Sequence, residues 1–249
     1  MMKKVFLTVF ILIFCWIAEV SLVELKGSVR HSEPLNTPMY TGTQALYRQL
    51  SANRGKTLPA AEVLAVALKG FNNLKSVPGA IKKDILTIID FSLPSNEKRL
   101  WVIDLQNRKI LYNDLVAHGK NSGGVYARNF SNTESTYMSS LGFYLTGNTY
   151  QGKHGLSLIL EGMDKDFNDN ARNRAIVMHG ANYVSNEFIK KYGRLGRSFG
   201  CPSLPPDISK KLINTIRDGS CLFIYYPDKR FLAKSQVLNP ANQLFTGLQ

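Results

Sequence analysis

From residue 83 onward, the chain consists of short, strongly apolar runs separated by turn-forming residues. The first run covers residues 85–91, and the next two, 100–105 and 109–113, flank residues 106–108 in the manner of a β-hairpin. Short runs rich in Ile, Val, Tyr and Phe between polar breaks are typical of β-strands. Further strand candidates lie at residues 141–146, 156–160, 175–178 and 220–226. We therefore predict an α+β fold with a β-dominated core.

Helices are expected in fewer places. Two lie before the strands, at residues 44–52 and 58–68, and two short ones, at 186–192 and 208–217, lie between later strands. The sequence contains no regular alternation of strand and helix, no Walker phosphate loop and no dinucleotide fingerprint. The helices before residue 81 are interpreted as a small packing extension of the strand-rich domain.

The N-terminus has the layout of an export signal. Lys3 and Lys4 precede an apolar run over residues 5–18, as in secretory signals. No clear cleavage site follows, so a membrane anchor that is not cleaved is an alternative, although a span needs about 20 apolar residues. We predict a signal peptide (or uncleaved anchor) at residues 1–23, a linker and helical extension at 24–80, and a catalytic domain at 81–249. The expected location is the periplasm or cell envelope.

The charge of the chain restricts its partners. The formal net charge of +13 favours an anionic partner such as anionic lipid or a carboxylate-rich wall polymer. Nucleic acid is not expected, because the protein is expected to be exported and its basic residues form no stripe interleaved with aromatic residues. The sequence has no H-E-x-x-H motif and no paired C-x-x-C motif, and its four histidines are isolated, so no metal site is predicted.

Two motifs carry the expected chemistry. His179 and Gly180 end an apolar run, and Cys201 follows between Gly200 and Pro202. A cysteine flanked by glycine and proline lies on a tight, non-helical bend, where its sulfur can be exposed and backbone N–H groups can converge on an anion. With a histidine close in sequence, these residues form the minimum set of groups for thiolate chemistry.

The pairing of His179-Gly180 with Ser198-Phe199-Gly200-Cys201 resembles the catalytic signature of the YkuD-type L,D-transpeptidases, which remodel bacterial peptidoglycan. The resemblance is greatest with the murein L,D-transpeptidase catalytic domain family, in which proline follows the cysteine, and it covers about residues 99–226. It implies a YkuD-like β-sandwich or barrel with a few short helices and no cofactor. It also implies that peptidoglycan stem peptides are the substrate and that carbapenem-type β-lactams inactivate the enzyme. Further matching segments lie at residues 116–119, 130–132, 139–144 and 150–158.

Roles for single residues follow from the same resemblance. It implies that Cys201 is the nucleophile and His179 its base, with the second imidazole nitrogen held by the carbonyl of Gly180. The backbone N–H groups of Gly200 and Cys201 are the candidate oxyanion donors. A thiolate beside an imidazolium would have a lowered pKa.

The sequence departs from the commoner family pattern at two places. Phe199 stands where many members have histidine, and Pro202-Ser203 replaces the usual hydrophobic residue and arginine. Arg197 is the nearest substitute for the substrate-binding arginine. Alternatively, Arg197 is an exposed surface residue without a role in substrate binding. Ser198 either contributes to substrate binding or braces the bend through backbone hydrogen bonds.

The function predicted from these features is a two-step acyl transfer. A thioester forms on Cys201, D-alanine leaves, and an amine or water then attacks the thioester. The alternatives are an L,D-carboxypeptidase, in which water is the acceptor, and a non-catalytic peptidoglycan-binding protein that retains the fold. A cysteine endopeptidase of the cell wall is disfavoured, because in those enzymes the cysteine usually precedes its histidine.

Overall fold

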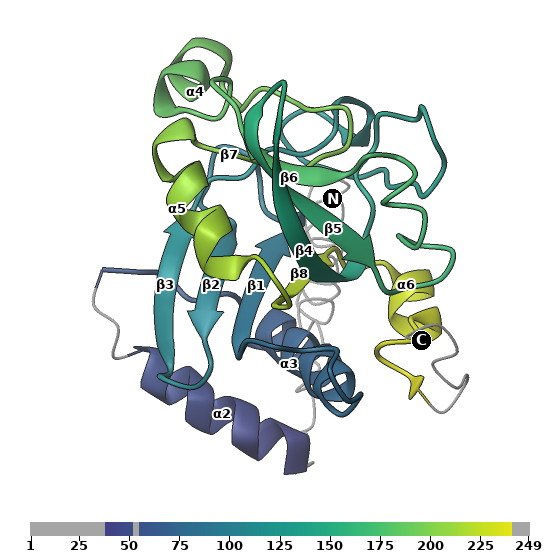
Figure 1. Cartoon of the computed structure of the whole chain (residues 1–249). Helices are drawn as coiled ribbons and strands as arrows, with labels where there is room; N and C mark the ends of the chain where they lie inside the picture. Colours follow the sequence, from purple (N-terminus) through teal and green to yellow (C-terminus); the bar gives the residue numbers. More distant parts are fainter. Residues whose placement is uncertain (1–37, 52–54, 241–249) are drawn as a thin grey trace, which may run out of the picture. The chain divides into compact units, whose positions relative to one another are not determined.

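The computed structural model describes residues 38–51 and 55–240 (Figure 1). The predicted signal peptide or anchor at residues 1–23 lies outside the described residues, as does the first part of the predicted linker. Within the described ranges, no helix combines the length and the apolar character that crossing a bilayer requires. The export signal therefore stays a prediction.

Eight strands form one curled sheet in the order β3-β2-β1-β8-β4-β5-β6-β7 (Figure 1). Neighbouring strands are antiparallel except for the pairs β1–β8 and β6–β7, which are parallel. The α+β class with a strand-dominated core is confirmed. The strands are β1 (Ile85–Asp90), β2 (Leu100–Asp104), β3 (Lys109–Asp114), β4 (Gly142–Gly152), β5 (Gly155–Gly162), β6 (Val177–Gly180), β7 (Ser203–Leu204) and β8 (Cys221–Tyr225).

Most predicted elements are present. Strands β2 and β3 form the expected antiparallel hairpin, and helix α4 has the predicted bounds. Helix α6 was not predicted; it begins where Asp228 accepts a hydrogen bond from Phe231 N at 2.8 Å. The two-residue strand β7 was also missed. The helices are α2 (Pro38–Ser51), α3 (Ala61–Lys75), α4 (Asn186–Tyr192), α5 (Pro206–Ile216), α6 (Lys229–Lys234) and the 3-10 turn Lys120–Ser122.

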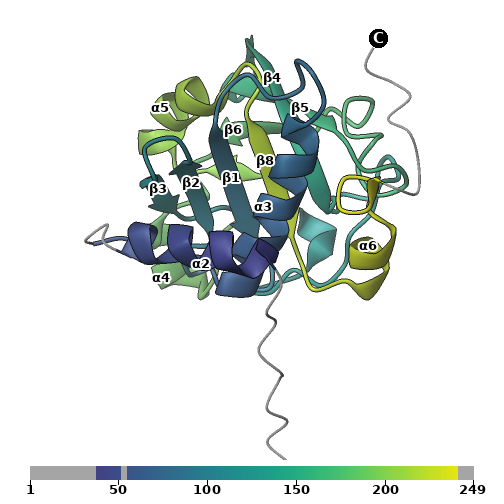
Figure 2. The ribbon, with the colours of Figure 1, turned by 90° about the horizontal axis from the view of Figure 1, so that it is seen from below.

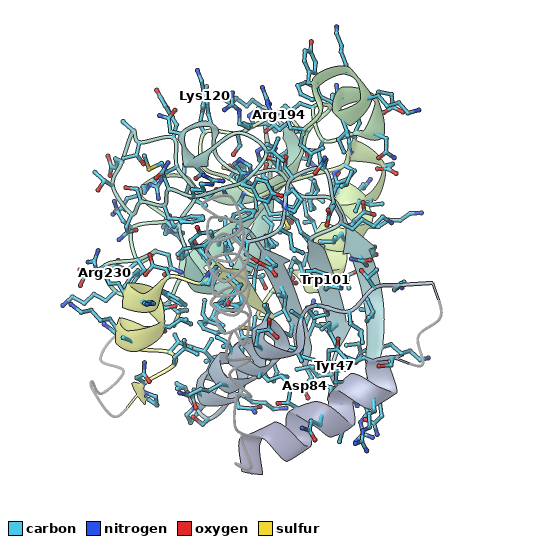
Figure 3. All side chains as sticks on the ribbon, turned by 180° about the vertical axis from the view of Figure 1, so that it is seen from behind. Tyr47, Asp84, Trp101, Lys120, Arg194 and Arg230 are labelled. Atoms are coloured by element: carbon cyan, nitrogen blue, oxygen red, sulfur yellow. The ribbon has the colours of Figure 1, made fainter. Side chains whose placement is uncertain are left out.

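Helix α3 packs on the sheet over β1 and β8 (Figure 2). It approaches the sheet closely because Gly70 has no side chain: a Cβ there would lie 2.1 Å from the ring of Phe143. The segment before α3 is attached to β2, since the buried Trp101 donates from Nε1 to Thr57 O at 2.9 Å (Figure 3). The apolar residues of α3 and of the strands thus belong to one core. The domain boundary at residue 81 stays a prediction.

Candidate active site

Strand β6 places His179 between two serines. In the sheet register, His179 pairs with Ser157 of β5 on one side and with Ser203 of β7 on the other. Residues directly opposite one another in a sheet project to the same face. The pairing of β6 with its two neighbours therefore positions the predicted base beside a hydroxyl from a distant part of the chain.

The Cys201 bend is held by its own hydrogen bonds. Ser198 Oγ accepts from Gly200 N at 3.0 Å and donates to the Cys201 carbonyl at 2.6 Å. Gly200 has a φ of +131°, and a Cβ there would lie 2.9 Å from the backbone oxygen of Met138. Both contacts of the Ser198 hydroxyl are internal to the bend, as the bracing interpretation requires.

The structure brings four of the predicted site residues to one cavity. Cys201, His179, Ser198 and Arg197 all line a cavity of about 410 Å³. The other lining residues come from the β4–β5 hairpin, the segment that enters β6, and the loops beside the bend: Tyr150, Gly152, Lys153, His154, Ser157, Arg174, Ala175, Ile176, Val177, Tyr183 and Phe199. The predicted residues Gly180 and Gly200 are adjacent in sequence but do not belong to this lining.

The hydrogen bonds of His179 define its tautomer. Nδ1 lies 2.9 Å from the carbonyl oxygen of Gly180, which can only accept, so Nδ1 carries the proton. In the neutral ring Nε2 is then unprotonated and accepts from Ser203 Oγ at 3.2 Å, and Ser203 Oγ in turn accepts from the Tyr183 hydroxyl at 3.0 Å. Burial lowers the pKa of His179, and the neighbouring His154 and Lys153 lower it further. The imidazole is thus neutral, with the acceptor on Gly180 that the resemblance implied.

The sulfur of Cys201 makes its contacts with the segment that enters β6. Val177 N donates to Sγ at 3.5 Å, and Sγ donates to Ala175 O at 3.7 Å. Within the described part of the chain, no hydrogen bond joins Sγ to His179. Burial raises the pKa of the Cys201 thiol, because it outweighs the lowering by the Val177 N–H and the Arg174 guanidinium. The lowered pKa expected from the sequence is therefore wrong for this state, in which thiol and imidazole are both neutral.

Both arginines of the cavity are held by hydrogen bonds to backbone carbonyls. Arg197 donates from Nη1 to the carbonyls of Lys120 at 3.2 Å and Gly123 at 3.0 Å. Arg174 is half-buried and donates to Ser131 O at 2.6 Å and Met138 O at 2.7 Å. Among the described residues, neither guanidinium forms an ion pair with a carboxylate. Two positive charges without an ion-pair partner therefore line the cavity that contains Cys201.

Only one of the two predicted oxyanion donors has no hydrogen bond to another residue. The Gly200 N–H is already bonded to Ser198 Oγ, whereas the Cys201 N–H donates to no other residue that the structure describes and acts on its own sulfur. The Gly200 N–H is occupied because Ser198 Oγ braces the tight bend through it.

Three residues of the cavity region were not predicted from the sequence: Arg174, Ser203 and Tyr183. One of the three left a signal, since Ser203 follows Cys201 by two residues and alternate residues of an extended segment share a side. The other two reach the cavity through strand pairing and loop folding that no local pattern indicates. His154 lines the cavity as a rim residue, and its ring stacks on that of His179, with centroids 4.4 Å apart and planes at 18°.

His118 is a structural residue and is separate from the cavity. It is buried, with Nδ1 accepting from Arg99 Nη2 at 2.8 Å and Nε2 lying 3.3 Å from Gly123 O. Burial and the charge of Arg99 lower the pKa of His118 to about 3. Across the described ranges, no group of His, Cys, Asp and Glu side chains is suited to hold a metal ion.

A comparison with protein-family models identifies the family to which this chain belongs. The model of the L,D-transpeptidase catalytic domain matches residues 56–225, which span α3, all eight strands and both motifs. The chain belongs to the L,D-transpeptidase catalytic domain family. The match begins ahead of α3, and it assigns the curled sheet to the YkuD-like fold of this family.

Solved L,D-transpeptidases show a distant likeness. One from Mycobacterium smegmatis is 12% identical with a TM-score of 0.36, and the alignment covers 57% of this chain and 59% of that one. One from Stackebrandtia nassauensis is 14% identical with a TM-score of 0.36, covering 75% and 92%. L,D-transpeptidase 3 from Mycobacterium tuberculosis, solved with a faropenem-derived adduct, is 9% identical with a TM-score of 0.37, covering 57% and 60%. The chain thus spans about three fifths of the first of these structures. No curated protein matches the sequence significantly.

Proposed function

We propose that this protein is a cysteine-dependent acyl transferase that acts on peptidoglycan stem peptides, with Cys201 as nucleophile and His179 as base. One observation carries the proposal. In a chain of this family, a thiol and an imidazole with an unprotonated Nε2 line the same cavity. A base that must remove a proton needs a free lone pair, and the Gly180 carbonyl holds the tautomer that provides it.

The first half of the reaction forms a thioester. His179 Nε2 leaves Ser203 Oγ and takes the thiol proton as Sγ attacks the carbonyl carbon of the third stem residue. The developing oxyanion accepts a hydrogen bond from the Cys201 N–H. The C–N bond to the terminal D-alanine then breaks, and the imidazolium returns its proton to the leaving amine.

The second half of the reaction releases the acyl group. An amine attacks the thioester and gives a proton to His179, the C–S bond breaks, and the sulfur recovers that proton. When the amine belongs to another stem the product is a crosslink, and when water attacks the product is a trimmed stem. Because both groups begin neutral, the proton moves during attack and no preformed ion pair is needed.

The charges at the cavity fit an acidic substrate. Arg174, Arg197 and Lys153 line it, and no lining residue is an aspartate or glutamate. Stem peptides carry carboxylates, which arginine binds well because its donors are arranged as a planar fork. We assign the carboxylate of the leaving D-alanine to this cationic side of the cavity.

Two extensions belong to the same proposal. The first is that carbapenem-type β-lactams acylate Cys201, supported by the L,D-transpeptidases solved with imipenem and with a faropenem-derived adduct. The second is that the protein acts outside the cytoplasm, in the periplasm or cell envelope, because peptidoglycan is assembled there.

A second candidate function is a peptidoglycan-binding protein that has kept the fold without turnover. One observation favours it: His179 Nε2 is bonded to Ser203, and Cys201 Sγ is bonded to Val177 N and Ala175 O, so no hydrogen bond joins the thiol to the imidazole among the described residues. The transferase is preferred because the thiol and an imidazole with an unprotonated Nε2 line the same cavity in a chain of this family.

Mass spectrometry of the intact protein tests the proposal. Incubation with a disaccharide-tetrapeptide or with a carbapenem is expected to give a covalent adduct and, with the peptide, crosslinked or trimmed products. Cys201→Ser is expected to give none of these, and His179→Ala to slow them severely. Cys221→Ala is the matched control, since Cys221 is a free, fully buried cysteine in β8.

The products separate the candidates. Crosslinked stems indicate a transpeptidase and trimmed stems alone indicate a carboxypeptidase. Peptide binding with no adduct and no product would support the second candidate, and an adduct that persists in Cys201→Ser would overturn the assignment of the nucleophile.

A further inference from the structure

Two exposed aromatic rings pair beside the cavity: Phe199 lines it, and Tyr137 packs on Phe199 without lining it. Phe199 is 65% exposed and Tyr137 is 44% exposed, and their ring centroids lie 4.6 Å apart. Phe199 lines the cavity and precedes Cys201 by two residues. We call these two residues the aromatic rim. Large apolar side chains that remain in solvent beside a cavity are typical of binding surfaces.

The fold holds the aromatic rim in place at a cost. Tyr137 has a φ of +55°, a left-handed conformation that residues with a side chain rarely adopt. Its carbonyl accepts from Asn121 N at 3.1 Å, and Arg174 binds the adjacent residue through Met138 O at 2.7 Å. Strained backbone of this kind persists only where the surroundings impose it, and it gathers at functional sites.

The substrate reaches beyond the cavity. A volume of about 410 Å³ lies at the small end of the range for ligand sites. When a stem peptide places its third residue at Cys201, the sugars to which the stem is attached must lie outside, at the mouth. The faces of aromatic rings carry negative charge density, and the C–H groups on one face of a pyranose are polarised positively. The two surfaces are complementary without any charged group.

We propose that Tyr137 and Phe199 form a subsite for a pyranose ring of the glycan strand. This inference rests on the proposed function, because it takes peptidoglycan as the ligand. It distinguishes the protein from an enzyme that reads the stem peptide alone, and it gives Phe199 a purpose where many family members have histidine.

Binding measurements in the Cys201→Ser background test the subsite without turnover. We expect the disaccharide-tetrapeptide to bind about five to ten times more tightly than the sugar-free tetrapeptide, as one ring contact suggests. Phe199→Ala is expected to abolish this ratio, because it removes the ring face that the disaccharide ligand contacts and the sugar-free tetrapeptide does not. Phe199→Trp is expected to keep the ratio, and Phe199→Leu to lose it, since leucine is apolar but has no ring face.

Tyr192→Ala is the matched control. Tyr192 is 51% exposed and pairs with Phe188 at 4.5 Å and 41°, nearly the geometry of the aromatic rim, but neither residue lines the cavity. It is expected to leave both affinities unchanged. Equal affinities of the two ligands for the parent protein, or an equal loss of both in Phe199→Ala, would overturn the subsite. Failure of the proposed function would appear separately, as absent turnover in the protein that retains Cys201.

Discussion

Replacement of Gly200 by alanine tests how the bend determines reactivity. The backbone at Gly200 has a φ of +131°, and an added Cβ would lie 2.9 Å from the oxygen of Met138 and 2.8 Å from Cδ1 of Ile176. The side chain of Ile176 can move, but the Met138 carbonyl is backbone and is held by Arg174. The bend itself therefore has to shift.

The cost follows from two contributions. A side chain in this region of φ costs about 1–3 kcal/mol, and overpacking against fixed backbone costs about 1–3 kcal/mol more. Together these give roughly 2–6 kcal/mol. For a chain of this size, each kcal/mol lowers the Tm by about 2–4 °C, so we expect a loss of roughly 5–20 °C.

Gly193→Ala is the matched control for this substitution. Gly193 also has a positive φ, +70°, but no atom lies within 4 Å of its added Cβ, so only the cost of the left-handed conformation remains, about 1 kcal/mol. Thermal unfolding followed by circular dichroism measures both variants, and the rate of Cys201 acylation by a carbapenem measures the site. We expect Gly200→Ala to slow acylation by about 100-fold, because small displacements of reacting atoms have effects of that size. Equal Tm values for the two variants, or an unchanged acylation rate in Gly200→Ala, would refute the reasoning.

Three further predictions concern protons. Because burial raises the pKa of Cys201, its alkylation by iodoacetamide should have a midpoint above the value of about 8.5 for a free cysteine, and a midpoint below that value would contradict the buried, neutral thiol. Ser203→Ala removes the donor that stabilises neutral Nε2, so the pKa of His179 should rise in an NMR titration; a fall would show that Ser203 Oγ does not donate to it. The folded-state pKa of His118 is about 3 and its unfolded value is about 6.5. At a pH between these two values, His118 is protonated in the unfolded chain and neutral in the folded one. The free energy of unfolding should therefore fall as the pH falls below about 6.5, by up to about 1.4 kcal/mol per pH unit, and His118→Phe should reduce this slope in urea titrations; parallel slopes would contradict it.

The sequence was sufficient for features that depend on local pattern. The β2–β3 hairpin, the bounds of α4 and the bend at Gly200-Cys201-Pro202 follow from residues adjacent in the chain. The Gly180 acceptor for His179 was implied by the family resemblance. Helix α6 was missed because it is only six residues long and depends on the Asp228 cap and on burial of Phe231.

The sequence was insufficient where distant segments meet. Arg174 reaches the cavity because the loop that precedes β6 folds against residues 131–138, and His154 reaches His179 through the pairing of β5 with β6. The direction of the Cys201 pKa shift was wrong for the same reason, since it depends on burial by several segments. Ser203 is the exception, because it follows Cys201 by two residues and this spacing can be read from the sequence.

Peptide mapping of the acyl-enzyme tests the central claim most directly. The protein is mixed with a stem tetrapeptide, quenched in acid within its first turnover, digested and sequenced by tandem mass spectrometry. We predict a tripeptide acyl group, lacking the terminal D-alanine, on the peptide that contains Cys201 and on no other. An acyl group on a different residue, or release of D-alanine with an unmodified Cys201 at every quench time, would contradict the account.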